Sequence, residues 1–434
     1  MEPASFVTEQ LLAERSERSL LLQYLIGIQS EYQHIPDTAI DALSAGLSMP
    51  AAEIVGVIEF YSFLHRTARK FDILFSDNIT DQMQDSRELL RQLSKRLAVT
   101  PGEVREDRQV AIDTTSCTGM CEQGPAMLVN GKAITRLDKH RLEEIAELVD
   151  EDIPLDRWPE EFFIVEDNIK RRDILLSSME SHTDYRHNLE RLCSTESQVI
   201  LDTLQASQLR GRGGAGFMTA IKWRACHDTQ ANQRYVVCNA DEGEPGTFKD
   251  RVLLQSYAHQ LIEGMTLCAH TIKATQGFIY LRGEYLYLLE ALQAILEQRR
   301  QQKLLGNSIL GRADFNFDID IHLGAGAYIC GEESALIESL EGKRGIPRKR
   351  PPFPVTHGYL NQPTVVNNVE TFIAAAQTIL HGADWLGSVG TDKSTGTKLL
   401  SISGDCAHPG IYEYPFGTTI QTILADCGAL DTQA

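Results

Sequence analysis

The sequence has no long apolar run and no excess of positive charge. It contains no stretch of about 18 apolar residues and no signal-peptide pattern at the N-terminus. Its 41 lysine and arginine residues are outnumbered by 60 aspartate and glutamate residues, which gives a formal net charge of −19. An acidic chain is repelled by nucleic acid and by anionic membrane surfaces. We therefore expect a cytoplasmic protein with no nucleic-acid partner and no direct membrane insertion.

Cysteine is present, but not in a disulfide pattern. The nine cysteines of the 434-residue chain are odd in number and irregularly spaced, unlike the framework of a small secreted domain. A chain of this length has room for two to four domains and a substantial core. A hydrophobic content of 42% with 23% charged residues is ordinary for a globular protein. Composition alone thus indicates a multidomain protein and leaves its chemistry open.

A glycine-rich segment, Leu209–Trp223 (LRGRGGAGFMTAIKW), is the most informative stretch of the chain. Glycine lets a backbone approach a ligand closely, and free N–H groups before a helix suit a phosphate or a flat polar ring. The spacing matches G-x-G-x-x-G, but an ordinary dinucleotide-binding fold needs a strand directly before the glycines. Residues 198–208 (QVILDTLQASQ) instead have the pattern of a helix end. We therefore exclude the ordinary Rossmann arrangement.

Two later blocks complete a family pattern. Tyr235–Asp250 reads YVVCNADEGEPGTFKD, and Gly324–Thr371 contains GAGAYICGEESALIESLEGKRGIPRKRPPFP followed by QPTVVNNVET. With the glycine segment, these blocks resemble the flavin- and NADH-binding subunit of respiratory complex I. They are equally similar to the diaphorase subunits of NAD-reducing hydrogenases and formate dehydrogenases. The resemblance covers roughly residues 195–430 and implies a domain that binds FMN and NAD.

Alternating strands and helices in the same region predict an α/β fold with its ligand beyond the strand ends. The predicted strands are Tyr235–Asn239, Gly277–Leu281 and Phe317–Leu323. The predicted helices are Ala220–His227, Tyr285–Gln298 and Glu332–Leu340.

The N-terminal part has a different pattern. Residues 5–65 carry apolar residues at helical spacing and predict a helical bundle. Phe71–Phe75 and Gln109–Asp113 have strand character, Ser86–Leu97 is helical, and Asn130-Gly131 predicts a hairpin. The bundle resembles the helical start of the two-iron subunit of complex I. The strands and helices that follow are similar to its thioredoxin-like domain.

One cysteine pair of that two-iron subunit is matched and the other is missing. Cys117 and Cys121 match the second pair, whereas Ser76 and Asp81 stand where the first pair is expected. A [2Fe–2S] cluster takes four thiolates, with histidine as the common substitute. Serine and aspartate are poor ligands for it. We therefore expect a degenerate docking domain with no [2Fe–2S] cluster and no metal ligands, and keep a cluster as the alternative.

These patterns predict five regions along the chain. They are a helical bundle (1–68), a thioredoxin-like domain (69–150), a charged connector (151–194), an FMN- and NAD-binding domain (195–390) and the start of a β-grasp domain (391–434). The related proteins continue into a helical domain with a Cys-x-x-Cys-x-x-Cys motif for a [4Fe–4S] cluster. These 434 residues lack that motif. We therefore expect such a cluster only in a C-terminal region outside this chain.

FMN is expected from chemical need as well as from resemblance. NADH gives up two electrons as a hydride and iron–sulfur centres accept one at a time, so a flavin is needed between them. The resemblance implies FMN contacts at Gly211, Arg212, Gly213, Gly214, Ala215, Lys222, Asn239, Asp241, Glu242, Tyr328, Gly331, Glu332, Glu333, Val366, Asn367, Asn368 and Thr371. The two adjacent glutamates would also suit the first turn of a helix, where acidic side chains complement the dipole without any ligand.

The resemblance implies NAD contacts at Phe217, Glu244, Arg350 and Phe353. The two phenylalanines match positions that sandwich the adenine by aromatic stacking. The arginine is expected at the ribose or pyrophosphate. Glu244, near the nicotinamide, and Glu332 are the expected catalytic residues. A second aromatic residue expected after the loop lysine is replaced by Ala225, which predicts altered stacking.

The combined pattern predicts the diaphorase subunit of an NAD-reducing hydrogenase. Such a subunit transfers hydride between NAD(H) and FMN and exchanges single electrons with iron–sulfur clusters. Complex I usually keeps the two-iron and flavin domains on separate chains, whereas here they are fused. The expected partners are an iron–sulfur electron-transfer subunit and the hydrogenase module. The alternatives are the NADH-binding subunit of a formate dehydrogenase or of complex I, and a non-catalytic nucleotide-sensing scaffold.

Overall fold

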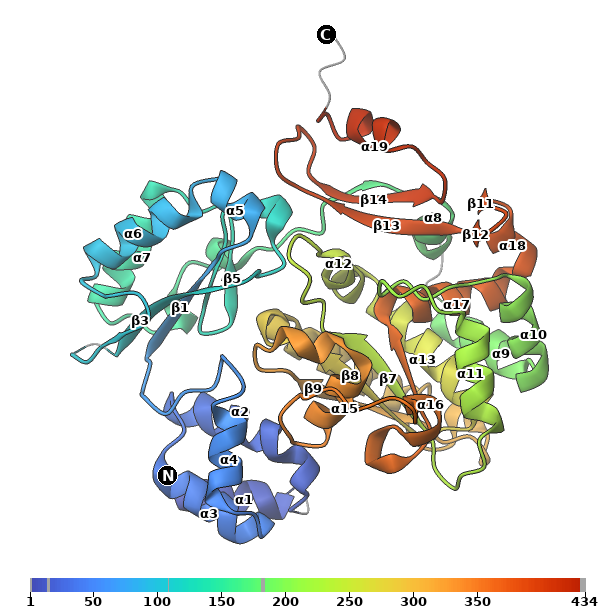
Figure 1. The fold of residues 1–434 in the computed structure, drawn as a ribbon, viewed down its shortest axis with the longest axis horizontal. Coiled ribbons are helices and arrows are strands. Elements are labelled where there is room, and N and C mark those ends of the chain that lie inside the picture. The colour runs from blue at the N-terminus through green and yellow to red at the C-terminus, as the bar shows by residue number, and fades with distance from the viewer. Residues whose placement is uncertain (1, 14–15, 108, 181–183, 430–434) are drawn as a thin grey trace.

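The computed structural model describes residues 2–13, 16–107, 109–180 and 184–429. Four regions follow one another along the chain: a helical bundle, a five-stranded sheet, a helix-covered four-stranded sheet and a three-stranded sheet (Figure 1). This is the mixed α/β architecture that the sequence predicts. Within the described residues, no helix combines the length and the apolar character that crossing a membrane requires.

The bundle buries the apolar face of each helix, as its helical periodicity predicts. Its helices are α1 (Pro3–Ala13), α2 (Leu21–Tyr32), α3 (Asp37–Leu47) and α4 (Ala51–Ile58). Their buried side chains form one hydrophobic cluster with residues of the four-stranded sheet, including Val237, Tyr280 and Val366. The bundle is therefore packed directly onto the region predicted to bind FMN.

The five-stranded sheet has the order β2-β3-β1-β4-β5. Its strands are β1 (Phe71–Ser76), β2 (Val104–Arg105), β3 (Val110–Thr115), β4 (Met127–Val129) and β5 (Lys132–Ile134). Its helices are α5 (Ile79–Met83), α6 (Ser86–Arg96) and α7 (Lys139–Asp150). The predicted hairpin joins β4 to β5, and both Asn130 (φ 49°) and Gly131 (φ 78°) adopt the left-handed conformation that its two-residue turn requires.

The four-stranded sheet, in the order β10-β7-β8-β9, is entirely parallel. Its strands are β7 (Tyr235–Ala240), β8 (Gln276–Leu281), β9 (Asp318–Leu323) and β10 (Thr364–Asn368). We call this sheet and its helices the central region. The helices are α9 (Tyr185–Ser194), α10 (Ser197–Ala206), α11 (Thr219–Asp228), α12 (Lys249–Ser256), α13 (Ala258–Ile272), α14 (Leu289–Gln301), α15 (Glu333–Leu340), α16 (Pro354–His357), α17 (Val369–His381) and α18 (Ala383–Gly387).

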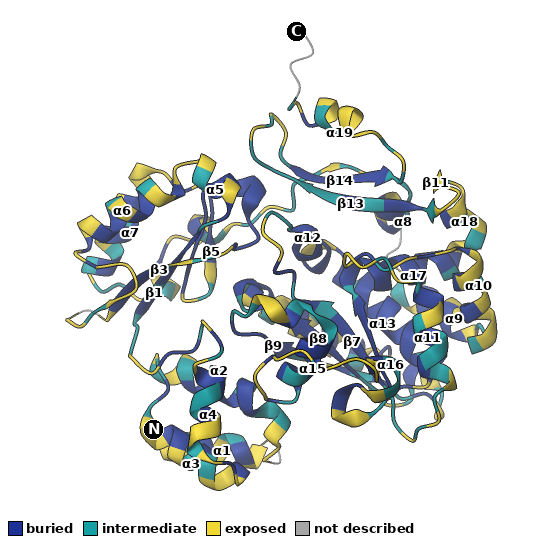
Figure 2. Ribbon diagram, viewed as in Figure 1, coloured by how far each residue is buried: buried dark blue, intermediate teal, exposed yellow. Residues whose placement is uncertain are grey.

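A parallel sheet is normally covered on both faces, and the strands of the central region are mostly buried (Figure 2). Strands β7 and β10 are neighbours in register, with Asn239 opposite Asn368. Because parallel strands end at the same edge, the segments that follow Asn239 and Asn368 begin side by side. The sequence analysis did not predict β10, α12, α13 or α17.

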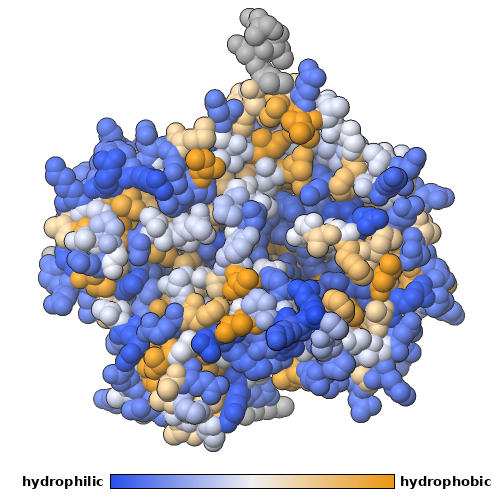
Figure 3. Space-filling model, in the orientation of Figure 1, coloured by the Kyte–Doolittle hydropathy of each residue, from blue (hydrophilic) through white to orange (hydrophobic). Residues whose placement is uncertain are grey.

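The last sheet combines segments far apart in the chain. Strands β13 (Thr397–Ile402) and β14 (Gly410–Pro415) pair antiparallel, and β6 (Ile169–Arg171) adds in parallel from the predicted connector. The connector also contains α8 (Ile174–Glu180). The short pair β11 (Gly390–Thr391) and β12 (Ser394–Thr395) precedes this sheet and α19 (Ile420–Asp426) follows it. Residues 430–434 of the predicted β-grasp region lie outside the described residues. In Figure 3, hydrophobic residues lie over the C-terminal segment and also in several other patches on this face.

Helices α13 and α17 approach each other closely at Gly264, and this contact gives a test of the packing. A Cβ at Gly264 would lie only 2.2 Å from the carbonyl oxygen of Phe372. We expect Gly264→Ala to lower the free energy of unfolding by about 1–3 kcal/mol, since the backbones must move apart. Gly56→Ala is the matched control. It lies within α4 with no atom near its Cβ position, and alanine there should raise stability by about 0.5–1 kcal/mol. Urea unfolding followed by circular dichroism measures both changes, and equal effects would contradict the packing argument.

Candidate functional site

Two adjoining cavities open at the carboxyl-terminal edge of the central sheet. The first, of about 670 Å³, contains Asp241, Glu242, Glu244 and Asp250, and we call it the acidic cavity. The second, of about 570 Å³, contains Phe217 and Phe353, and we call it the aromatic cavity. The residues lining both are Gly213, Asn239, Gly331, Glu332 and Asn368. A ligand at this edge can therefore extend from one cavity into the other.

The structure places every predicted site residue in the lining of these cavities. Besides the shared residues, those in the acidic cavity are Arg212, Gly214, Asp241, Glu242, Glu244 and Tyr328. Those in the aromatic cavity are Gly211, Ala215, Phe217, Lys222, Glu333, Arg350, Phe353, Val366, Asn367 and Thr371. The predicted residues come from three sequence blocks that the parallel sheet brings to one edge.

The glycine loop connects α10 to α11 and presents free backbone donors. The loop is closed at its base, where Gly211 N–H donates to Phe217 O at 2.8 Å and Arg212 N–H donates to Thr371 Oγ1 at 2.9 Å. Among the described residues, no acceptor is found for the N–H groups of Gly213 and Gly214. Gly214 has φ +117°, a conformation that side-chain-bearing residues rarely adopt. The loop can therefore donate two hydrogen bonds to a ligand in the cavities.

Arg212 turns its side chain away from the loop's open side. Its side chain is 4% exposed. The guanidinium donates to Arg210 O and lies 4.9 Å above the ring centroid of Phe416. The Glu370 carboxylate lies 3.9 Å from its Nε. Burial lowers the pKa of Arg212, although Glu370 opposes this shift. The side chain fastens the loop to the C-terminal segment, so its positive charge is not directed at a phosphate.

Four charged side chains form a compact cluster in the aromatic cavity. Lys222 Nζ lies 2.8 Å from Glu333 Oε2, and Arg350 bonds both Glu332 and Glu333. Glu332 also caps α15, since its Oε2 accepts from the N–H groups of Ser334 and Ala335. As the helix-start alternative expects, the two glutamates stand at the beginning of a helix: Glu332 is the N-cap of α15 and Glu333 lies in its first turn. The second oxygen of Glu332 remains committed to Arg350.

The asparagines at the strand ends hold the surrounding segments in place. Asn239 Nδ2 donates to Gly331 O at 2.8 Å, and Asn367 Oδ1 accepts from Trp223 Nε1 at 2.9 Å. Asn368 Oδ1 accepts from Glu370 N at the start of α17. These amides orient the strand ends, helix α11 and the turn at Gly331 relative to one another. Much of their hydrogen-bonding capacity is thus used by the protein itself.

The acidic cavity contains a buried lysine that the sequence analysis missed. Lys249 Nζ lies 2.6 Å from Asp250 Oδ1 and 3.1 Å from Glu370 Oε2, and is 3.2 Å from Asn368 Oδ1. Burial alone would lower the pKa of Lys249, but the surrounding carboxylates raise it above its usual value. Burial and the Asp250 charge raise the pKa of Glu242 to about 8. The only signal in the sequence was the position of this lysine at the end of the second block.

Aromatic side chains mark the opening of the site. Phe217 is 54% exposed and Phe353 52% exposed, and Ala225 lines the same cavity. Tyr328 donates its hydroxyl proton to Glu244 Oε2 at 2.6 Å. Half-exposed aromatic rings around a cavity are available for stacking on a flat ligand.

A second polar cluster lies in the five-stranded-sheet region. Asn78 Nδ2 lies 2.8 Å from Ser76 Oγ and 3.5 Å from the Sγ atoms of Cys117 and Cys121, and it also donates to Asp81. The two Sγ atoms are 3.4 Å apart. The four positions compared with iron ligands thus converge, as two sulfurs and two oxygens around one amide. A two-iron cluster takes four thiolates, so the fit of these side chains to that group is partial.

The buried carboxyl of Asp241 makes the stability of the fold depend on pH. Burial raises its pKa to about 7, against about 3.9 in an unfolded chain. The folded state therefore favours the protonated acid, and the stability present below about pH 4 is lost as pH rises toward 7. We expect Asp241→Asn in the ligand-free protein to remove this loss, so that its free energy of unfolding exceeds that of the wild type by about 1–2 kcal/mol between pH 5 and 8. The gain is only this large because Asp241 is partly exposed. Urea unfolding across this range measures the difference, and a pH-independent difference would contradict the assignment.

Two family models of known proteins match different parts of the chain. Residues 204–377 match the family model of the Nuo51 FMN-binding domain, and residues 7–150 match that of the thioredoxin-like [2Fe–2S] ferredoxin. The alpha subunit of the NAD-reducing hydrogenase HoxS of Cupriavidus necator is 42% identical over 99% of this chain and 73% of its own length. A subunit of the NADH-quinone oxidoreductase of Escherichia coli is 43% identical, but over only 59% of this chain and 58% of its own length.

A solved structure extends the likeness to three dimensions. The H2-reduced NAD+-reducing [NiFe]-hydrogenase aligns with a TM-score of 0.89 and 41% identity, over 95% of this chain and 69% of that one.

The prediction that no [2Fe–2S] cluster is expected in this chain is wrong. The match of residues 7–150 to the thioredoxin-like [2Fe–2S] ferredoxin family contradicts it. The prediction weighed only four ligand positions, whereas the match extends over the helical bundle and the five-stranded sheet. The likeness to the hydrogenase subunit spans both this domain and the FMN-binding domain. The chain therefore belongs to the family of NAD-reducing hydrogenase alpha subunits, which joins a thioredoxin-like [2Fe–2S] ferredoxin domain to a Nuo51-type FMN-binding domain.

Proposed function

We propose that this chain is the diaphorase subunit of an NAD-reducing hydrogenase and that its two cavities hold FMN and NAD(H). The observation that carries the proposal is that Gly213 and Gly214, whose N–H groups have no acceptor among the described residues, line a cavity bounded by two neighbouring strand ends. Bound FMN supplies a carrier that accepts a hydride and releases its electrons singly. The similarity of nearly the whole chain to a hydrogenase subunit, against 59% of it for the complex I relative, favours the hydrogenase over complex I.

Each group of site residues has a distinct proposed task. The glycine loop donates its free N–H groups to the flavin, and the asparagines fix the strand ends around it. Phe217 and Phe353 stack on the adenine of NAD(H), and Tyr328 holds Glu244 at the nicotinamide end. Lys222 and Arg350 hold the paired glutamates in place through ion pairs. Walls built from three segments exclude water from the reacting faces.

The proposed partners follow from the family. Two of the similar proteins, one of them over 99% of this chain, are from NAD-reducing hydrogenases. We therefore propose that this chain assembles with an iron–sulfur electron-transfer subunit and a hydrogenase module. Isolation of the native assembly and metal analysis test this proposal. Nickel would support it, whereas molybdenum or tungsten would assign the chain to a formate dehydrogenase.

The glycine loop gives a direct test of flavin binding. A Cβ at Gly213 would lie 3.2 Å from the Asn368 Cβ, on the cavity side of the loop. We expect Gly213→Val to fold and to bind FMN at least about tenfold more weakly, because its side chain occupies space needed by the ring. Flavin absorbance and fluorescence titration measure the effect. Gly387→Val is the control, since its Cβ position is open. A full FMN complement in the Gly213 variant would contradict the proposal.

Glu333 gives a test of nucleotide choice. Its carboxylate lies in the aromatic cavity beside Lys222 and Arg350. A carboxylate near the adenosine ribose favours a 2′-hydroxyl and repels a 2′-phosphate. We expect kcat/KM for NADH to exceed that for NADPH by about ten- to several-hundred-fold, which corresponds to about 1.4–4 kcal/mol.

The matched variants are Glu333→Gln, which should reduce this preference, and Glu297→Gln, an exposed residue on α14, which should leave it unchanged. Comparable kcat/KM values for the two nucleotides in the wild-type protein would refute the role of Glu333.

A further inference from the structure

A network of buried polar contacts joins the acidic cavity to the segment that carries Cys117 and Cys121. We call residues 241–248, which follow β7 and line that cavity, the acidic loop, and residues 116–123 the cysteine segment. Arg282, directly after β8, is 3% exposed. Its Nη2 donates to Cys117 O at 2.9 Å and its Nη1 to Glu242 O at 2.5 Å. One side chain thus bonds the backbone of both segments.

Two further side chains reinforce this link. Tyr285 donates its hydroxyl to Glu242 Oε2 at 3.1 Å, and a Cβ on Gly119 would lie 2.5 Å from the same hydroxyl oxygen. The cysteine segment therefore lies directly on the tyrosine ring. Arg251 donates its backbone N–H to Glu242 and forms a fully buried ion pair with Glu122. Both ends of the cysteine segment are tied to residues that also hold Glu242.

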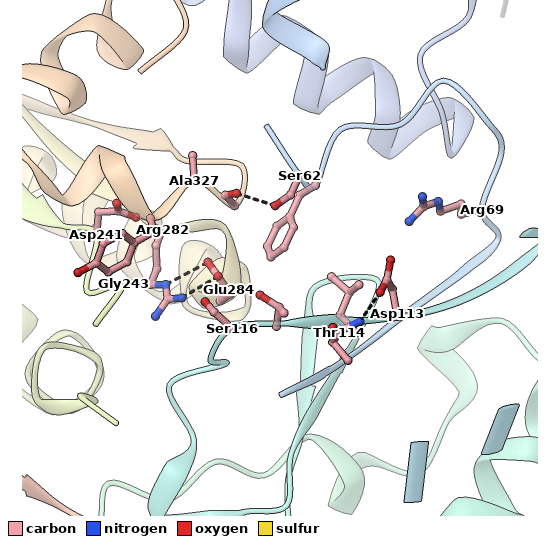
Figure 4. Close-up of a pocket in the computed structure, with 15 residues that line it drawn as sticks. Ser62, Arg69, Asp113, Thr114, Ser116, Asp241, Gly243, Arg282, Glu284 and Ala327 are labelled. Carbon is pink, nitrogen blue, oxygen red and sulfur yellow. Dashed lines mark hydrogen bonds and ion pairs between the residues drawn. The ribbon is translucent and has the colours of Figure 1, made fainter. Parts of the chain in front are cut away.

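The interface next to Arg282 is hollow. A cavity of about 320 Å³ lies there, between the bundle, the five-stranded-sheet region and the central region. Figure 4 shows Arg282 and Glu284 paired beside Ser116, with Asp241 and Gly243 on the same side of the cavity. Beside this space, Arg282 joins Cys117 O to Glu242 O of the acidic loop. The backbone of Gly246, in the same loop, also bonds the Cys117 thiol.

The arginine is itself held rigidly. Glu284 Oε1 lies 2.6 Å from Arg282 Nη2, and Glu284 Oε2 lies 3.0 Å from Arg282 Nε. A buried guanidinium is tolerated only when its donors are paired, so it cannot shift its contacts independently. Displacement of the acidic loop must therefore move the arginine, lose a hydrogen bond or displace the cysteine segment.

We propose that Arg282 is a positioning residue that couples occupancy of the acidic cavity to the order of the cysteine segment. The inference rests on the proposed function, in which FMN occupies this cavity. A ligand that fixes the acidic loop also fixes the carbonyl of Cys117 through the shared guanidinium. The coupling is reciprocal, so a change at the cysteine segment alters FMN affinity by the same factor.

Hydrogen–deuterium exchange of the full chain, with and without FMN, tests the coupling. In the wild-type protein, FMN should slow amide exchange about fivefold or more in the glycine loop, the acidic loop and the cysteine segment. In Arg282→Met the two loops should still be protected by FMN, whereas the cysteine segment should not. Arg282→Lys keeps the charge near Glu284 but cannot bond both carbonyls, and should behave in the same way.

Arg299→Met is the matched control. Arg299 is also fully buried in the central region, where it pairs with Glu263 and donates to His259 O. These partners belong to neither segment, so FMN should protect all three segments in this variant. Loss of protection in both methionine variants would mean that general destabilisation is the cause, and would overturn the specific role of Arg282.

The outcomes separate the two proposals. If FMN slows exchange in none of the three segments of the wild-type protein, the proposed function fails. If it protects the glycine loop and the acidic loop but not the cysteine segment, the function stands and the coupling is refuted. Protection of the cysteine segment that survives in Arg282→Lys refutes the role of Arg282, even if the methionine variant does not fold.

Discussion

The site depends on the parallel pairing of β7 with β10. Their register sets Asn239 opposite Asn368, so the acidic loop and the start of α17 leave the sheet at adjacent points. The glycine loop reaches this edge because Arg212 N–H bonds Thr371 and Trp223 bonds Asn367. A slip of β10 by one residue would turn Asn368 to the opposite face of the sheet, away from Asn239. Neither cavity would then keep its lining.

Much of the fold follows from local signals in the sequence. The hairpin at Asn130-Gly131 and strands β1, β7, β8 and β9 have turn chemistry or apolar runs that stand out against their neighbours. Strand β10 does not, because TVVNN is short and ends in two polar residues. Helix α17 is buried on nearly all sides, so its sequence lacks the polar face by which an amphipathic helix is recognised.

The candidate site was predictable as a set of residues, but the roles of individual side chains were not. Arg212 is the clearest case, since it was predicted as an FMN contact, whereas its side chain is buried against Phe416. Lys249 went unnoticed because a single lysine among acidic residues has the same sequence pattern as a surface ion pair. The direction of a side chain depends on partners distant in the chain, which one sequence does not reveal.

Two buried arginines connect the walls of the cavities to neighbouring regions, each to a different one. Arg212 holds the glycine loop against Phe416 in the C-terminal segment, and Arg282 holds the acidic loop against the cysteine segment. Both guanidiniums are buried and turned toward protein rather than ligand, so their cost in desolvation is offset by the segments they join. The shape of the cavities is therefore a property of three regions together. A ligand site with such walls is sensitive to displacement of the regions beside it.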